Sequence, residues 1–91
     1  EAKKLVAGMI SEEIKELKEI EKQLKTIEPE QDRLMLWGGI LEEKGFYMEA
    51  IDNYKKAYIL EPSDGIAYRI AYCYDKLDLE ELRDWWNKKI K

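Results

Sequence analysis

The chain has 91 residues, of which 45% are hydrophobic and 40% are charged, and its formal net charge is -4. This length suits one small domain, and the apolar content excludes a disordered chain. The 16 Lys and Arg residues are interleaved with 20 Asp and Glu residues, so no basic patch of the kind that binds phosphate is present and nucleic acid is not an expected partner.

Residues 1–27 carry apolar side chains at helical spacing. Pro29 disfavours helix at the residue before it, so this first segment should end near Ile27. Two interpretations remain open. Gly8 is costly inside a helix and Ser11 is a favourable N-cap, which predicts a break and a second helix from Ser11. The unbroken apolar stripe instead predicts one long helix.

Residues 31–64 contain two helical patterns, which are separated by Gly45 and closed by Pro62. The first has the i, i+3, i+4, i+7 spacing of a buried helix face and consists of Leu34, Trp37, Gly38 and Leu41. The second keeps the same period and consists of Tyr47, Ala50, Ile51, Tyr54, Ala57 and Tyr58.

The small residues of this segment predict close helix packing. Gly38 and Ala50 allow the two paired helices to approach each other, and Ala57 leaves room for the helix that follows. Leu36 and Ile40 form a second apolar stripe on the first helix. Because a surface helix needs only one such stripe, the second one predicts burial against two neighbouring helices.

Residues 65–91 repeat the pattern less regularly. The apolar positions of the expected first helix are Ala67, Ile70, Ala71, Tyr74 and Leu77, and those of the second are Leu79, Leu82, Trp86 and Ile90. The turn between them has no glycine, because residues 76–79 run where residues 44–47 ran before. This placement aligns Leu77 with Gly45.

Trp85 falls at the edge of the apolar face of the last helix. A final helix has no neighbour to cover such a residue, and an apolar end of a helical stack indicates missing repeats, self-association or a partner. The alternative is that Trp85 lies flat over its own helix pair.

The spacing of small and bulky residues over Gln31 to Asp64 resembles the tetratricopeptide repeat, the helix-turn-helix unit of a stacked solenoid. The resemblance is strongest in residues 31–64, which form a full repeat. It extends over residues 65–91 as a shortened repeat and over residues 1–29 as a partial or atypical repeat or a long helix. It implies one all-α domain, residues 1–91, of antiparallel helix-turn-helix repeats stacked as a short right-handed solenoid.

In this family the first helices of successive repeats line a concave groove that holds a peptide. The resemblance places the groove at Met35, Gly39, Glu42, Tyr68, Tyr72 and Asp75. Some members clamp a carboxylate-ended peptide with Lys and Asn, but Met35 and Gly39 stand at those places, so carboxylate capture is not expected. Acidic Glu42 and Asp75 favour an apolar peptide with basic flanks. The alternative is that Tyr68 and Tyr72 only cover the core with their hydroxyls in water.

The residue types that the sequence lacks exclude several kinds of chemistry. The chain has no histidine, and Cys73 is its one cysteine, so we expect no catalytic or metal site, no cofactor and a buried, unreactive thiol. No apolar run is long enough to span a membrane, and a single cysteine fits a cytoplasmic location. We therefore expect a protein-binding module and not an enzyme; the alternative is a homo-oligomer that assembles through its N-terminal helix or its Trp85 end.

Overall fold

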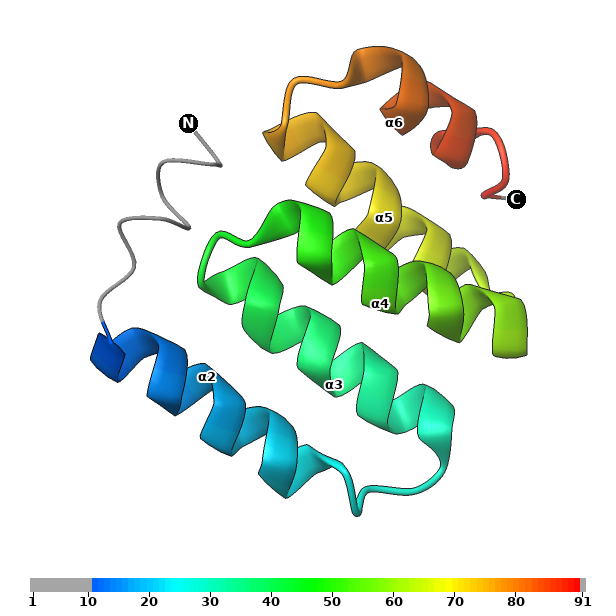
Figure 1. Ribbon diagram of the computed structural model, residues 1–91. Coiled ribbons are helices and arrows are strands. Elements are labelled where there is room, and N and C mark those ends of the chain that lie inside the picture. Colours follow the sequence, from blue (N-terminus) through cyan, green and yellow to red (C-terminus); the bar gives the residue numbers. More distant parts are fainter. Residues whose placement is uncertain (1–10, 91) are drawn as a thin grey trace.

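The computed structural model describes residues 11–90, and the side chains of residues 15–90. Within this range the chain forms five α-helices and no strand, so the predicted all-α class is confirmed. The helices are α2 (Ser11–Leu24), α3 (Glu30–Glu43), α4 (Tyr47–Leu60), α5 (Asp64–Lys76) and α6 (Glu80–Asn87). Successive helices run in opposite directions (Figure 1). The predicted break near Gly8 lies outside the described residues.

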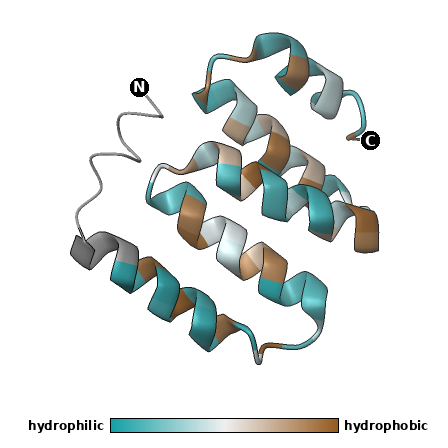
Figure 2. Cartoon of the chain, in the orientation of Figure 1, coloured by the Kyte–Doolittle hydropathy of each residue, from teal (hydrophilic) through white to brown (hydrophobic). Residues whose placement is uncertain are grey.

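Helix α2 is the most loosely attached helix of the five. Hydrophilic residues dominate it, and its apolar residues form separate bands (Figure 2). Leu24 is buried and Leu17 is partly buried against the core. Lys44 Nζ donates to Glu16 Oε1 at 2.8 Å, which ties α2 to the turn after α3. The helix ends at Leu24, slightly before the predicted end near Ile27.

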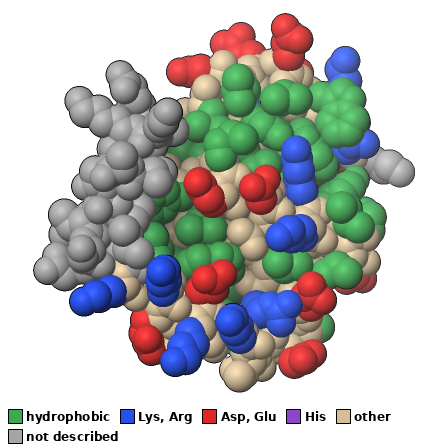
Figure 3. Space-filling model, viewed as in Figure 1, with side chains coloured by type: hydrophobic (Ala, Val, Ile, Leu, Met, Phe, Trp, Pro, Cys, Tyr) green, Lys and Arg blue, Asp and Glu red, His purple; other side chains and the backbone are tan. Residues whose placement is uncertain are grey.

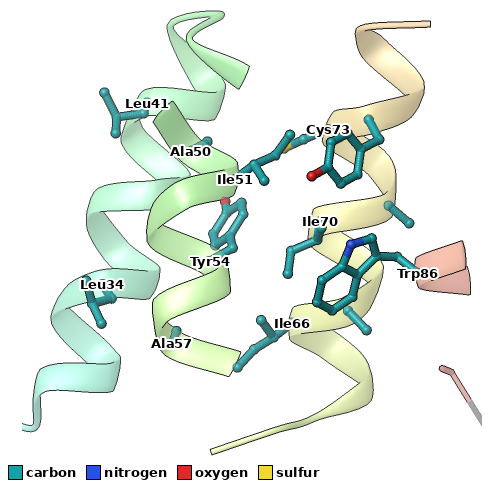
Figure 4. Packing of buried hydrophobic residues seen from close by; sticks show 13 residues of the cluster. Leu34, Leu41, Ala50, Ile51, Tyr54, Ala57, Ile66, Ile70, Cys73 and Trp86 are labelled. Carbon is teal, nitrogen blue, oxygen red and sulfur yellow. The ribbon is translucent and has the colours of Figure 1, made fainter. Parts of the chain in front are cut away.

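The core lies between α3, α4 and α5 and is completed by Trp86 of α6 (Figure 4). Gly38, Ala50 and Ala57 are all buried, as predicted for small residues between packed helices. The ring of Tyr54, only 1% exposed, packs directly on Gly38. A Cβ atom added at Gly38 would lie 2.6 Å from Tyr54 Cε1, so the bare glycine is what admits this ring.

The side chain of Gln31 joins the start of α3 to the end of α4. Its Nε2 atom donates to the carbonyl oxygens of Ala57 at 3.2 Å and Glu61 at 2.8 Å. Ala57 O also accepts the N–H of Glu61 at 3.0 Å, whereas Glu61 O lies just beyond α4, where the helix supplies no backbone donor. Gln31 therefore caps the C-terminal end of α4, although it lies 26 to 30 residues earlier in the chain than the carbonyls it contacts.

The turn between α3 and α4 and the turn between α5 and α6 have the same geometry but use different residues. Gly45 has a φ of 90°, and the N–H of Phe46 donates to Leu41 O at 2.8 Å. Asp78 has a φ of 59°, and the N–H of Leu79 donates to Tyr74 O at 3.0 Å. Both are helix-ending turns with a left-handed residue, a conformation that Asp tolerates better than most side chains.

This geometry corrects the predicted alignment of the turns. Asp78, and not Leu77, is the counterpart of Gly45, because Asp78 carries the positive φ. The two helix pairs therefore correspond at a spacing of 33 positions (45 to 78), and the same spacing pairs Gly38 with Ala71.

Two predicted apolar stripes are only partly buried. Leu36 is 47% exposed, so the prediction that two neighbours bury this stripe is wrong at Leu36. The reason is that α2 lies on the side of α3 that bears Leu34 and Trp37, and these two residues line one hollow with Leu24 of α2. On α6, Trp86 is buried as predicted, but Leu79 and Leu82 are exposed.

The visible face of the molecule divides into two regions. Lys and Arg side chains are interleaved with Asp and Glu over its lower half (Figure 3). Hydrophobic side chains gather over α6 and the adjoining part of α4 (Figure 3). Ile59, Leu82 and Trp85, which line one hollow between α4 and α6, are all exposed.

We predict that Gly38→Ala and Gly39→Ala have opposite effects on stability. At Gly38 the new methyl group would collide with the buried Tyr54 ring and should lower the free energy of unfolding by about 1 to 3 kcal/mol. At Gly39 the nearest atom is Tyr54 Oη at 3.8 Å, an ordinary contact, so alanine should raise it by up to about 1 kcal/mol. Urea unfolding of both variants measures the difference, and equal effects would contradict the packing described.

Candidate functional site

Tyr68 and Tyr72 stand one turn apart on the solvent side of α5. Ser63 is the N-cap of this helix, because its Oγ atom accepts the Ile66 N–H at 3.2 Å. Its buried side is formed by Ile66, Ala67, Ile70, Ala71, Cys73 and Tyr74. Tyr68 is 57% exposed, and its ring stacks on that of Tyr72 with centroids 6.5 Å apart. The pair is therefore not part of the core.

A hollow of about 260 Å³ adjoins this tyrosine pair. Tyr68, Ala71, Tyr72 and Asp75 contribute its α5 wall, and Arg83 and Asn87 contribute its α6 wall. Arg83 Nη1 donates to Asp75 Oδ1 at 2.7 Å, and its Nε donates to Asp84 at 3.0 Å. The hydrogen bond to Asp75, and to a lesser extent the one to Asp84, raises the pKa of the Arg83 guanidinium above its ordinary value. The hollow thus has an aromatic side and a paired-charge side.

The hollow exists because α5 and α6 do not pack as α3 and α4 do. At the spacing of 33 positions, Asn87 corresponds to Tyr54 and Arg83 corresponds to Ala50. Tyr54 fills the space between its helices, whereas the short side chain of Asn87 lines an open space.

Glu42 has a different place from the one predicted for a groove residue. Its side chain is only 12% exposed. Tyr54 Oη donates to Glu42 Oε1 at 2.7 Å, and Arg69 Nη1 lies 3.5 Å from Glu42 Oε2. Glu42 therefore links α4, α3 and α5 inside the fold, and Arg69 is the member of this link nearest to solvent.

The structure brings together only some of the six predicted groove residues. Tyr68, Tyr72 and Asp75 line one hollow. Glu42 reaches the same helix through Arg69. Met35 and Gly39 lie on α3; Met35 is partly buried against the core, and neither residue lines the hollow beside Tyr68.

Sequence reasoning missed Arg83, Asn87 and Arg69. Arg83 meets Asp75 across the turn between two helices, at a separation of eight residues. Helical periodicity relates residues on one helix face and gives no signal for such a pair. The one usable hint was the repeat spacing itself, which places a polar residue, Asn87, where the first pair has Tyr54.

Trp85 is 53% exposed and Trp86 is buried, in agreement with the predicted difference between them. Their rings meet edge to face, with centroids 5.2 Å apart. Trp86 also meets Tyr58 of α4 edge to face at 5.1 Å, which anchors α6 on α4. Trp85 does not share that anchor and remains available at the surface.

Two kinds of site are not found in the described part of the chain. Among the side chains of residues 15–90, no group of three or more Cys, Asp or Glu is placed to hold a metal ion. None of the helices in this range has the length and apolar character needed to cross a membrane.

No family model matches the chain, and comparisons with curated proteins and with solved structures gave no match. The resemblance to the tetratricopeptide repeat therefore depends on the residues quoted above.

Cys73 is a buried free thiol beside Glu42 and Tyr54. Burial, and then the negative charge of Glu42, raise the pKa of Cys73 to about 12. Burial and the hydrogen bond to Glu42 likewise raise the pKa of Tyr54 well above its ordinary value. Both groups therefore stay protonated in the folded protein at neutral pH, and Cys73 serves as packing.

We predict that stability falls as pH rises above about 9, because the thiol then ionises only in the unfolded chain. The unfolded state binds fewer protons than the folded state in this range, so each pH unit lowers the free energy of unfolding by up to about 1.4 kcal/mol. Cys73→Ala should be less stable at pH 7.5 but should lose this part of the slope. Urea unfolding between pH 7.5 and 10 measures it, and identical slopes in the two proteins would refute the assignment.

Proposed function

We propose that this chain is a short tetratricopeptide-like module that binds a peptide segment of another protein and performs no chemistry itself. The corresponding helix pairs α3–α4 and α5–α6 support this proposal. Their spacing of 33 positions is one residue shorter than the 34 of the tetratricopeptide repeat. The stacking as a right-handed solenoid belongs to the same proposal.

The observation that carries the binding role is the exposed Tyr68–Tyr72 stack beside a hollow. Tyrosine is a frequent interface anchor, because its ring offers a large rigid surface at low entropic cost. Neither ring is among the buried residues of the core. An apolar side chain of a partner, placed in the hollow, would contact both rings and the methyl group of Ala71.

The proposed partner is an apolar peptide with basic flanks. Asp75 and Glu42 supply the negative charge near this face, but each is already paired with an arginine. The charge preference should therefore be weak, a few-fold in affinity at most, since exposed ion pairs contribute little. A reducing compartment such as the cytoplasm suits the single thiol of this chain.

We expect Tyr68→Ala to weaken binding of an apolar peptide by about thirtyfold, the effect of losing a true interface anchor. Tyr68→Phe keeps the ring and should bind within about twofold of the original chain. Met48→Ala, an exposed apolar position on α4, is the matched control. Peptides selected from a displayed library and titrated by fluorescence anisotropy supply the affinities. Equal effects of Tyr68→Ala and Met48→Ala on every selected peptide would refute the proposed face.

Self-association is the second candidate function, and the exposure of Trp85 at the last helix is what favours it. If the Trp85 end joins two copies, the mass measured by light scattering should rise with concentration, and Trp85→Glu should abolish the rise. A constant monomer mass over the whole soluble range would eliminate this candidate.

A further inference from the structure

A second and larger hollow lies on the opposite side of α5. It has a volume of about 590 Å³ and is lined by Lys55, Tyr58 and Ile59 of α4, Tyr74 of α5, and Glu81, Leu82, Trp85 and Trp86 of α6. Tyr74 follows Tyr72 by two residues, which is about 200° around a helix. The hollow therefore faces away from the Tyr68–Tyr72 pair, and we call it the α4–α6 hollow.

Most of the side chains that line the α4–α6 hollow are apolar or aromatic, and Lys55 and Glu81 are its charged residues. Ile59 is 79% exposed, and Leu82 and Trp85 are also open to solvent. The surface that they form is part of the hydrophobic region over α6 and α4 (Figure 3). Pockets of about 300 to 1,000 Å³ with aromatic walls are typical of binding sites. The edge-to-face contacts of Trp86 with Tyr58 and Trp85 fix the aromatic part of the surface.

Two lysine ammonium groups border this hollow without a carboxylate partner among the described residues. Lys89 Nζ lies 4.2 Å from the centroid of the Trp85 ring, and Lys55 Nζ lies 5.5 Å from that of Tyr74. Neither ammonium belongs to an ion pair of residues 15–90. Glu81 is the single carboxylate of the lining, so the two cations Lys55 and Lys89 leave a net positive charge beside the apolar surface, which favours an acidic ligand.

Self-association through the Trp85 end, the second candidate above, suits this surface less well than a partner of opposite charge does. A stable dimer buries about 800 Å² on each partner, far more than a few exposed side chains supply. A two-fold dimer would also place the same patch on both sides and bring lysines toward lysines. An extended peptide fits poorly as well, since the walls are helices, whose backbone groups already bond internally.

A helix is the form of peptide that this surface suits. Helices α4 and α6 flank α5 and run in the same direction (Figure 1). A partner helix laid between α4 and α6 would present its apolar residues at i, i+3, i+4 and i+7 to the hollow in one line.

We propose that the α4–α6 hollow binds an acidic amphipathic helix of a partner protein, whose apolar residues contact Ile59, Leu82 and Trp85 and whose carboxylates pair with Lys55 and Lys89. The proposal does not depend on the peptide site at Tyr68, because the two surfaces lie on opposite sides of α5.

The test begins with a displayed library of peptides about 16 residues long, long enough for a marginal helix. Each peptide has Leu, Ile, Phe or Trp at the four stripe positions and Ala, Gln, Glu or Lys elsewhere; a second library is proline-rich. Selection uses the whole chain, and peptides that still bind Trp85→Ala are removed. We expect the remaining peptides to be helical and enriched in Glu beside the stripe.

Fluorescence anisotropy then measures the affinity of one selected peptide for charge variants. Lys55→Glu with Lys89→Glu should weaken binding by at least about tenfold, and a copy of the peptide with Lys in place of Glu should regain the loss. Lys56→Glu with Lys88→Glu is the matched control, which makes the same charge change one residue away from each site and should stay within about threefold. Tyr68→Ala should leave this binding unchanged. Circular dichroism melting confirms that each variant is folded.

Several outcomes would overturn the proposal. One is that no selected peptide depends on Trp85, or that those that do are rich in Lys or Pro. Another is that the two pairs of charge variants weaken binding equally. A third is that sedimentation shows a second copy of the chain displaced by the peptide, which would make the hollow a self-association surface.

Discussion

The packing of the Tyr54 ring against Gly38 determines how α3 and α4 lie against each other. A buried tyrosine needs a partner for its hydroxyl group, and Glu42 supplies the acceptor one turn after Gly38. The carboxylate of Glu42, whose side chain is only 12% exposed, in turn gains a compensating charge from Arg69 of α5. One aromatic side chain thus fixes the distance between α3 and α4 and links both of them to α5.

The second helix pair keeps the positions of this arrangement but not its chemistry. Asp75 stands where Glu42 stood, and it accepts from Arg83 instead of a tyrosine. Asn87 replaces the ring, and the space that the ring would occupy opens to solvent beside Tyr68 and Tyr72. The candidate peptide site is therefore a consequence of losing one core residue, and this explains why it lies in the last pair of helices.

Sequence periodicity predicted the fold well wherever burial depends on a single helix. The burial of Gly38 and Ala57, and the difference between Trp85 and Trp86, followed from helical spacing. Periodicity gives the direction of a side chain around its own axis but not the neighbour that it meets. Leu36 was therefore predicted to be buried although α2 lies elsewhere.

The candidate site was less predictable, because its contacts join different helices. The Asp75–Arg83 bond and the capping of α4 by Gln31 depend on how whole helices are placed. Asp78 shows a related limit: several residue types tolerate a left-handed conformation, so the missing glycine concealed a turn that is geometrically equivalent to the first.

The two sides of α5 differ in how they treat charge, and this difference bears on selectivity. Beside Tyr68 and Tyr72 the carboxylates are already paired with Arg83 and Arg69, so the peptide binding proposed there would depend mainly on the shape of an apolar side chain. Beside Tyr74 and Trp85, Lys55 and Lys89 stand over aromatic rings and form no ion pair with another residue of 15–90, and Glu81 is the one carboxylate of the lining. Charges that are already paired contribute little to the choice between partners. Unpaired charges that lose their water on binding discriminate strongly between partners of different charge. A single helix with 13 residues can therefore present one surface that selects by shape and another that selects by charge.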